Sequence, residues 1–196
     1  SSLAPEVMRL VFGLQPGGVD LAILDSTDPA QVIAAAHRAP MEKTLYIVSS
    51  KSGGTAEVNA FLDYFWQRAQ EAVGNHASEH FIAITDPDTS LEKLAQERNF
   101  RQIFLGDPKV GGRYSALTAF GLAPAALMGL ELDRLLDRAA WLARQTTPEI
   151  PVGRNPGAVL GAILGEATLQ GRDKLTFIPD PELAQFGSCL EPLVAE

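Results

Sequence analysis

The residues most able to do chemistry lie at positions 50–55, which read Ser-Lys-Ser-Gly-Gly-Thr. Adjacent glycines let a backbone turn with its N–H groups pointing inward, and the hydroxyls of Ser50, Ser52 and Thr55 add further donors. A helix that follows such a loop adds partial positive charge at its N-terminus. The segment predicts an anion site, with an ordinary strand-to-helix turn capped by Thr55 as the alternative.

A second loop, residues 110–115, joins two glycines to a fixed cation. Gly111 and Gly112 let the backbone approach a ligand closely, and the planar guanidinium of Arg113 is always charged. At the mouth of a pocket, such a cation stabilises negative charge that develops on a reacting oxygen. A surface arginine on a glycine hinge is the alternative. We also expect Ser115 to cap the helix that follows.

The other reactive side chains show no arrangement typical of a site. His37, His76 and His80 are scattered, which argues against a structural zinc site, and we assign them no role. Cys189 is the sole cysteine, so no internal disulfide can form, and its apolar surroundings favour a buried thiol over a nucleophile. The Walker and Gly-x-Gly-x-x-Gly patterns of nucleotide-binding loops are also absent.

The elements that must position the two loops alternate between strands and helices. Apolar residues predict strands at 44–48, 81–84 and 103–105, and shorter runs at 21–24 and 175–178 predict two more. The alternation predicts an α/β protein, a three-layer α/β/α sandwich with a mainly parallel, about five-stranded sheet. Helices are expected over 4–12, from 29 onward, after 55 to 73, and over 90–97, 115–129, 132–144, 156–169 and 181–196.

A parallel sheet also indicates which loops are expected to form the ligand site. Ligands of such sheets bind beyond the carboxyl ends of the strands. The loops after Val48, Ile84 and Leu105 are therefore expected at the site, together with the initial Ser1 and Ser2.

The charge and hydropathy of the sequence argue against some classes of binding partner. The formal net charge of -8 argues against nucleic acid and anionic membranes, because both require a basic face. The sequence shows no signal peptide and no apolar run of the ~20 residues that span a bilayer, so we expect a cytoplasmic protein. Both ends of the 196 residues interrupt recognisable patterns, so we expect one domain, residues 1–196, from a longer protein.

Together these segments resemble phosphoglucose isomerases, in particular the isomerase part of bifunctional transaldolase/phosphoglucose isomerases. Residues 50–57 are similar to the family's phosphate loop, 111–115 to its signature, 1–5 to the end of the loop after its first strand, and 191–196 to the helix that bears its catalytic glutamate. The resemblance covers nearly the whole chain in order. It implies a single sugar isomerase (SIS) domain of flavodoxin-like or Rossmann-like type.

The resemblance also implies a mechanism. Ser1 and Gly112 would contact the sugar, and Arg113 would stabilise an enediolate intermediate. Glu196 would move a proton between C1 and C2, which interconverts glucose 6-phosphate and fructose 6-phosphate. No metal or organic cofactor is implied, and a homo-oligomer is expected. The sugar 6-phosphate would be held by the side chains or backbone of Ser50, Lys51, Ser52 and Thr55.

Some residues depart from the family pattern. Gly53 and Gly54 replace bulkier residues, Phe120 replaces a smaller one, and Pro192 stands where the family usually has a substrate-contacting glutamine. The family's ring-opening histidine and late lysine would lie beyond Glu196, so we expect the chain alone to be inactive. The alternative is a non-catalytic sugar-phosphate-binding SIS regulator, for which the Gly-Gly-Arg loop and the terminal glutamate would not be expected.

Overall fold

The computed structural model describes residues 2–195, so Ser1 and Glu196 lie outside the described part of the chain. The chain divides into two compact units. The first unit runs to Leu130 and includes the residues from Ser188 onward, and the second is Glu131–Gly187. Whether the chain is one functional domain stays a prediction.

A parallel sheet lies at the centre of the first unit. Its strands are β1 (Tyr46–Ser49), β2 (Phe81–Thr85) and β3 (Gln102–Leu105), in the order β1-β2-β3. The register pairs Ile47 with Ile82, and Ile84 with Phe104. The prediction of an α/β fold with a parallel sheet is confirmed, although the described residues form three strands rather than about five.

The two strands expected at 21–24 and 175–178 were wrong. Both segments lack regular structure. The run at 21–24 places Leu24 against the core of the first unit, so its apolar side chain is covered without a strand ladder. In the run at 175–178, Ile178 is 91% exposed. An apolar run becomes a strand only where a neighbouring strand supplies backbone partners, which sequence alone does not show.

Helices surround the sheet of the first unit, and local sequence accounts for several of their ends. Asp28 caps α2, since its carboxylate accepts a hydrogen bond of 3.0 Å from the N–H of Ala30. Thr89 caps α4 in the same way through the N–H of Glu92. The elements are α1 (Leu3–Phe12), α2 (Pro29–His37), η1 (Met41–Lys43), α3 (Ala56–Val73), η2 (Gly74–His80), α4 (Ser90–Glu97), η3 (Gly112–Leu117), α5 (Ala119–Leu127) and α8 (Gly187–Ala195).

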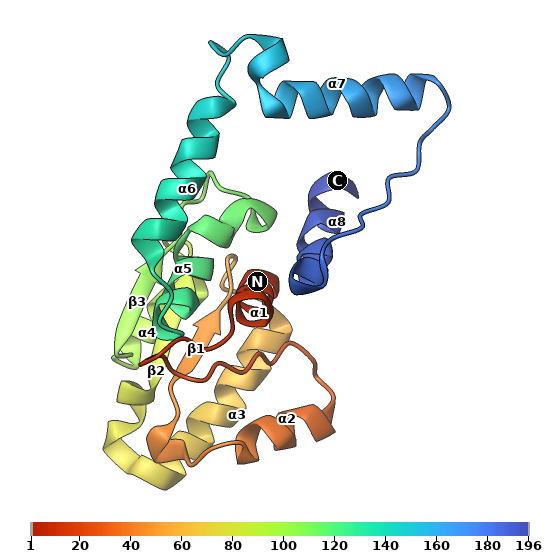
Figure 1. Ribbon diagram of the computed structural model, residues 1–196. Helices are drawn as coiled ribbons and strands as arrows, with labels where there is room; N and C mark the ends of the chain where they lie inside the picture. The colour runs from red at the N-terminus through yellow and green to blue at the C-terminus, as the bar shows by residue number, and fades with distance from the viewer. Residues whose placement is uncertain (1, 196) are drawn as a thin grey trace. The chain divides into compact units, whose positions relative to one another are not determined.

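The helices cover both faces of the sheet, so the three-layer arrangement is present in this unit (Figure 1). Every residue of β2 is buried, and its side chains alternate between two clusters. Phe81 and Ala83 pack with α3 and α4, whereas Ile82 and Ile84 pack with Phe120 of α5. The buried residues that α3 and α4 contribute to the first cluster are Leu62, Phe65, Ala69, Leu91 and Ala95.

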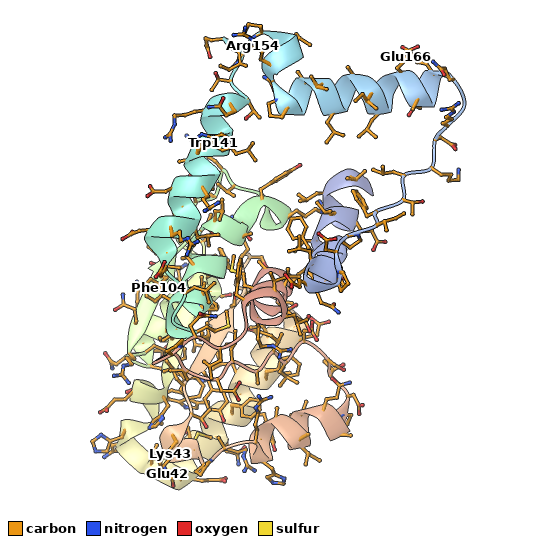
Figure 2. The ribbon with its side chains drawn as sticks, in the orientation of Figure 1. Glu42, Lys43, Phe104, Trp141, Arg154 and Glu166 are labelled. Carbon is orange, nitrogen blue, oxygen red and sulfur yellow. The ribbon has the colours of Figure 1, made fainter. Side chains whose placement is uncertain are left out.

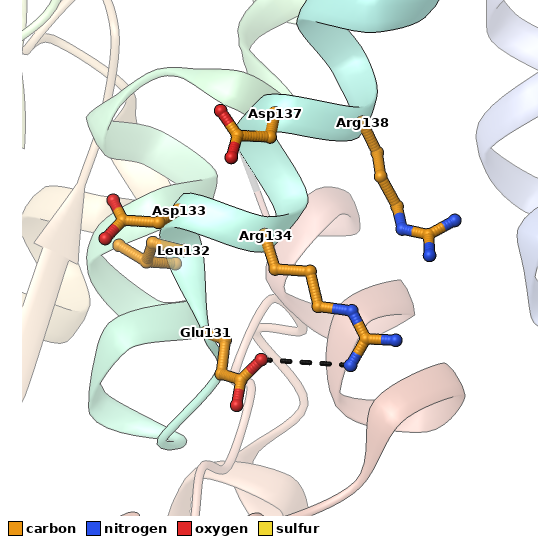
Figure 3. Close-up of a pocket in the computed structure, with 6 residues that line it drawn as sticks. All are labelled: Glu131, Leu132, Asp133, Arg134, Asp137 and Arg138. Carbon is orange, nitrogen blue, oxygen red and sulfur yellow. Dashed lines mark ion pairs between the residues drawn. The ribbon is translucent and has the colours of Figure 1, made fainter.

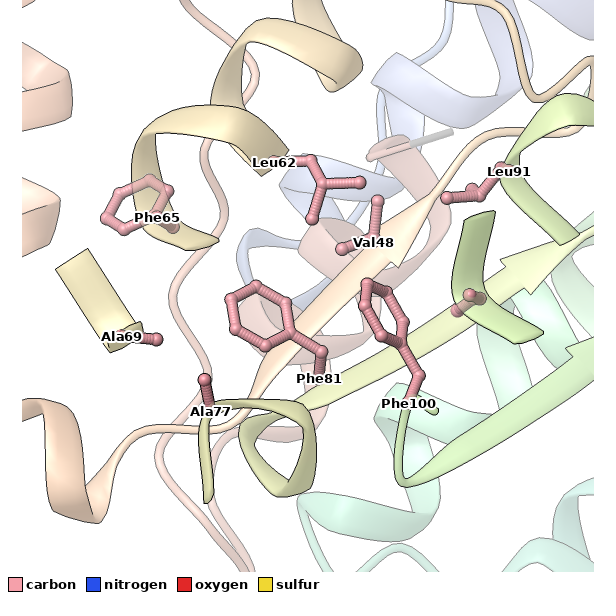
Figure 4. Close-up of a cluster of buried hydrophobic side chains, with 10 residues drawn as sticks. Val48, Leu62, Phe65, Ala69, Ala77, Phe81, Leu91 and Phe100 are labelled. Carbon is pink, nitrogen blue, oxygen red and sulfur yellow. The ribbon is translucent and has the colours of Figure 1, made fainter. Parts of the chain in front are cut away.

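Phe81 is the aromatic centre of the first cluster (Figure 4). It is fully buried, and its ring centroid lies 5.2 Å from those of Tyr46 and Trp66 and 5.3 Å from that of Phe100. The aromatic stripe of α3 is thus part of the core, as its helical spacing predicts.

The second unit consists of α6 (Leu132–Gln145), η4 (Val152–Arg154), α7 (Pro156–Leu169) and η5 (Pro181–Phe186). Asn155 caps α7 by accepting from the N–H of Ala158 at 3.0 Å and donates to the carbonyl of Thr147. Trp141 of α6 is 58% exposed (Figure 2). Within residues 2–195, no helix is long and apolar enough to cross a membrane.

We predict that Phe81→Ala lowers the free energy of unfolding by about 3–5 kcal/mol, because it opens a cavity among three aromatic rings. Phe104→Ala is the matched control on an edge strand, where the side chain is partly exposed, and should cost less than about 1 kcal/mol. Urea denaturation followed by circular dichroism measures both changes. Equal losses for the two variants would contradict this description of the core.

Candidate functional site

The loop at 50–55 leaves the carboxyl end of β1 and leads directly into α3. Ser50 is 3% exposed, and its N–H donates to the carbonyl of Ile84 at 3.0 Å, which fixes the start of the loop to β2. Its Oγ lies 2.8 Å from Oγ1 of Thr55. Two of the predicted phosphate-binding hydroxyls therefore meet across the loop.

A tight turn brings these two residues together. The N–H of Gly53 donates to the carbonyl of Ser50 at 3.2 Å, and Gly53 has φ +68°, which favours glycine. A Cβ at this position would lie 2.6 Å from Cβ of Thr89. The carbonyl of Gly53 also accepts from Oγ of Ser90 at 2.8 Å, so the loop rests against the start of α4.

The start of α3 offers unused donors. Thr55 is the N-cap residue, but its side chain caps no N–H group of the helix. Within the described residues, the backbone N–H groups of residues 51, 52 and 55–58 donate no hydrogen bond. Such groups at a helix N-terminus form a ready anion site. The alternative of a turn capped by the Thr55 side chain does not match this geometry.

The side chain of Lys51 connects the loop to the two neighbouring strand ends. Its Nζ lies 2.5 Å from Oδ2 of Asp86 and donates to the carbonyl of Asp107 at 3.0 Å. We call these two contacts the Lys51 bridge. The sequence analysis missed Asp86, although an acid directly after β2 and a lysine in the loop after β1 are a signal that could have identified the pair.

The second predicted loop forms η3. Arg113 is exposed, and a Cβ at Gly112 would meet no atom within 4 Å. Ser115 is 2% exposed and donates to the carbonyl of Gly112 at 2.6 Å. The expectation that Ser115 caps the next helix was wrong, because Thr118 caps α5 through the N–H of Phe120. The 3-10 turn ends before α5 begins, so the cap falls three residues later.

The remaining predicted site residues are not all described. Ser1 and Glu196 lie outside the described residues. Helix α1 packs against both α5 and η3, so α1 and the 3-10 helix that carries Gly112 and Arg113 are neighbours in the first unit. Burial raises the pKa of the Cys189 thiol, which keeps this group protonated at neutral pH.

One hollow is lined by residues of the second unit and by none of the predicted site residues. It measures about 540 Å³ and is lined by one short stretch at the start of α6. Figure 3 shows the carboxylates of Asp133 and Asp137 on one side of this stretch and the guanidiniums of Arg134 and Arg138 on the other. Glu131 and Arg134 lie 3.8 Å apart. Exposed charges from a single helix do not converge on a ligand, so this hollow is a solvated helix surface.

A smaller cavity of about 350 Å³ adjoins the 50–55 loop at Gly53. Its other walls come from α3, α4 and Arg98. Among residues 2–195, no group of three or more histidine, cysteine, aspartate or glutamate side chains is arranged to hold a metal ion. The best-formed arrangement of polar groups is therefore the 50–55 loop with its neighbouring strand ends.

Comparisons of the sequence with a family profile and with individual proteins point to the same family. Residues 1–169 match the sequence profile described as phosphoglucose isomerase. The chain is 35% identical over 205 residues to a glucose-6-phosphate isomerase of Synechococcus sp. (strain JA-3-3Ab), and 33% identical over 202 residues to one of Citrifermentans bemidjiense. These alignments cover all of the chain but only 37% of each relative.

Solved structures share the fold. A hypothetical protein of Thermus thermophilus matches with a TM-score of 0.86 at 26% identity, over 98% of this chain and 45% of that one. A glucose-6-phosphate isomerase of Chlamydia trachomatis matches with a TM-score of 0.76 at 24% identity, over 96% of this chain and 37% of that one.

We predict that Gly53→Ala destabilises the protein by about 2 kcal/mol or more, because φ is positive and the new methyl group would collide with Thr89. Gly54→Ala is the matched control, since a Cβ there meets no atom within 4 Å, and its effect should stay within about 0.5 kcal/mol. Thermal and urea unfolding compare the two variants. A Gly54→Ala loss as large as that of Gly53→Ala would contradict the described turn.

Proposed function

The chain belongs to the phosphoglucose isomerase family, and from this premise we propose that it binds a sugar 6-phosphate at the 50–55 loop. We further propose that it forms part of an enzyme that interconverts glucose 6-phosphate and fructose 6-phosphate. The chain spans about 37% of the length of the curated relatives that it matches, so this activity is proposed for the enzyme as a whole. The family premise also supports a homo-oligomer in the cytoplasm.

One observation carries the binding proposal. The hydroxyls of Ser50 and Thr55 lie 2.8 Å apart beside the unused N–H groups at the start of α3. A phosphate dianion accepts hydrogen bonds from several donors at once, and fixed donors bind it without a cost of reorganisation. Ser52 and the backbone N–H of Lys51 complete the proposed phosphate contacts.

The proposed chemistry is a proton transfer between adjacent carbons. A carboxylate, assigned by the family resemblance to Glu196, takes the proton from C2 of the open-chain aldose, and the electron pair left behind forms an enediolate. The same carboxyl group returns the proton to C1 while a proton passes from the hydroxyl on C2 to the oxygen on C1, which gives the ketose. Arg113 would stabilise the negative oxygen of the intermediate, while Ser1 and Gly112 would contact the sugar. Every step uses side chains and substrate alone.

Sugar-phosphate binding and catalytic turnover have different structural requirements in this proposal. The phosphate loop is local to the first unit, so the 196-residue chain is expected to bind a sugar phosphate by itself. Proton transfer needs a base held in a narrow geometry. The chain spans about 37% of the length of the relatives that it matches, so we propose binding for these 196 residues and turnover for the whole enzyme.

We predict that Thr55→Val weakens fructose 6-phosphate binding by about 1–2 kcal/mol, because one donor to the phosphate is lost while the side chain keeps its shape. Thr55→Ser keeps the hydroxyl and is the matched control, expected to bind within about threefold of the original chain. Titration calorimetry on the 196-residue chain measures all three affinities. If Thr55→Val binds as tightly as the original chain, the phosphate does not sit on this loop.

A further inference from the structure

The side chain of Lys51 has no role in the proposed function, which uses only its backbone N–H. A lysine beside an anion site would ordinarily be taken as a direct counter-ion for the phosphate. The contacts of its ammonium group indicate a different role, because Nζ contacts Asp86 and the carbonyl of Asp107 instead of projecting into solvent.

We propose that Lys51 is a positioning residue. The Lys51 bridge holds together the loops that follow β1, β2 and β3, and the phosphate is bound by hydroxyls and backbone N–H groups rather than by this ammonium group. The proposal rests on the proposed function, because the 50–55 loop is taken as the phosphate site.

The Lys51 bridge joins the loops at the carboxyl ends of β1, β2 and β3. Lys51 is the second residue after β1, Asp86 is the first after β2, and Asp107 is the second after β3. The backbone joins two of these loops as well, since the N–H of Asp86 donates to the carbonyl of Lys51 at 3.2 Å. Lys51 and Asp86 are thus connected twice, which fixes both the direction of the lysine and the position of the loop.

The charges of Lys51 and Asp86 compensate each other. The side chains of Lys51 and Asp86 are only 24% and 15% exposed, so each charge depends on the other for compensation. An ammonium group held at 2.5 Å from a carboxylate contributes little net charge to a neighbouring anion. The Lys51–Asp86 pair therefore fixes the position of the 50–55 loop and adds little positive charge to it.

Packing also locates the carboxylate of Asp86. Oδ1 of Asp86 is buried and has no hydrogen-bond partner among the described residues. A Cβ on Gly106 would lie 2.6 Å from this oxygen and 2.7 Å from the ring of Phe120. The carboxylate therefore lies between the lysine on one side and bare glycine backbone on the other.

The bridge also leads toward the Gly-Gly-Arg loop. The carbonyl of Asp107, which accepts from Lys51, also accepts from the N–H of Val110 at 3.0 Å. Oδ1 of Asp107 accepts from the N–H of Lys109 at 2.9 Å. This turn ends directly before Gly111, so the bridge determines where the segment that carries Arg113 begins relative to the phosphate loop.

Removing Asp86 distinguishes positioning from direct charge attraction. If Lys51 attracts the phosphate, Asp86→Ala removes a competing negative charge, and fructose 6-phosphate binds as well or more tightly. If the bridge positions the loops, Asp86→Ala and Lys51→Met both weaken binding by about tenfold. The double variant should then bind no more weakly than either single variant, because the same link is lost in all three.

The controls match each change in charge. Glu42→Ala and Lys43→Met remove the same charges from η1, which precedes β1 and so lies at the opposite end of the strand from the phosphate loop (Figure 2). Both should leave binding unchanged within about twofold. Lys51→Arg keeps a cation able to reach Asp86 and should retain affinity within about threefold. If Lys51→Met fails to fold, Lys51→Arg and Asp86→Ala are the variants that are compared.

Hydrogen exchange of the 196-residue chain tests the bridge without a ligand. Exchange at the N–H of residue 86 and of Val110 should speed up in Lys51→Met and in Asp86→Ala, while the N–H of Ala83 in β2 stays protected. Tighter phosphate binding by Asp86→Ala, or unchanged exchange in both variants, would overturn the proposal. If the original chain binds no fructose 6-phosphate, the proposed function fails, and the exchange result still decides whether the bridge holds the loops.

Discussion

The burial of β2 on both faces is the constraint from which the rest of the first unit follows. Phe81 and Ala83 pack in a cluster with residues of α3 and α4, and Ile82 and Ile84 pack in another with Phe120 of α5. β2 is thereby fixed between two helical layers, with β1 and β3 paired to it in parallel. Parallel pairing places the carboxyl ends of all three strands at one edge of the sheet, so the loops that follow them become neighbours.

The candidate site uses this edge in two ways. The 50–55 loop brings two hydroxyls together, and several N–H groups of the loop and of the start of α3 donate no hydrogen bond within the described residues, which suits an anion. The Lys51 bridge joins the same loop to Asp86 and Asp107, whose loop runs on to Arg113. As proposed, a neutral set of donors would bind the phosphate and a compensated ion pair would position the loops, so recognition of a phosphate would not depend on the overall charge of -8.

Sequence reasoning identified what short-range patterns determine. The apolar run before Ser50, the glycine turn and the amphipathic helix after Thr55 are contiguous, so β1, the loop and α3 could be predicted with their order and layers. The contacts of Lys51 could not, because they join residues 35 and 56 positions apart, and only the register of the sheet brings them together. The extra strand at 21–24 failed for the same reason, since strand formation depends on a distant partner. The roles of Ser1 and Glu196 stay predictions, because they rest on family resemblance alone.

Amide resonances of the isotope-labelled chain, titrated with fructose 6-phosphate, test the central claim most directly. The account predicts saturable shifts that are largest at the N–H groups of residues 51, 52 and 55–58, where the structure leaves donors unused. Smaller shifts should follow at residues 86 and 107–110 through the Lys51 bridge. Saturable shifts that are largest at the start of α6, or a chain whose loop amides do not respond at all, would contradict the assignment of the phosphate to this loop.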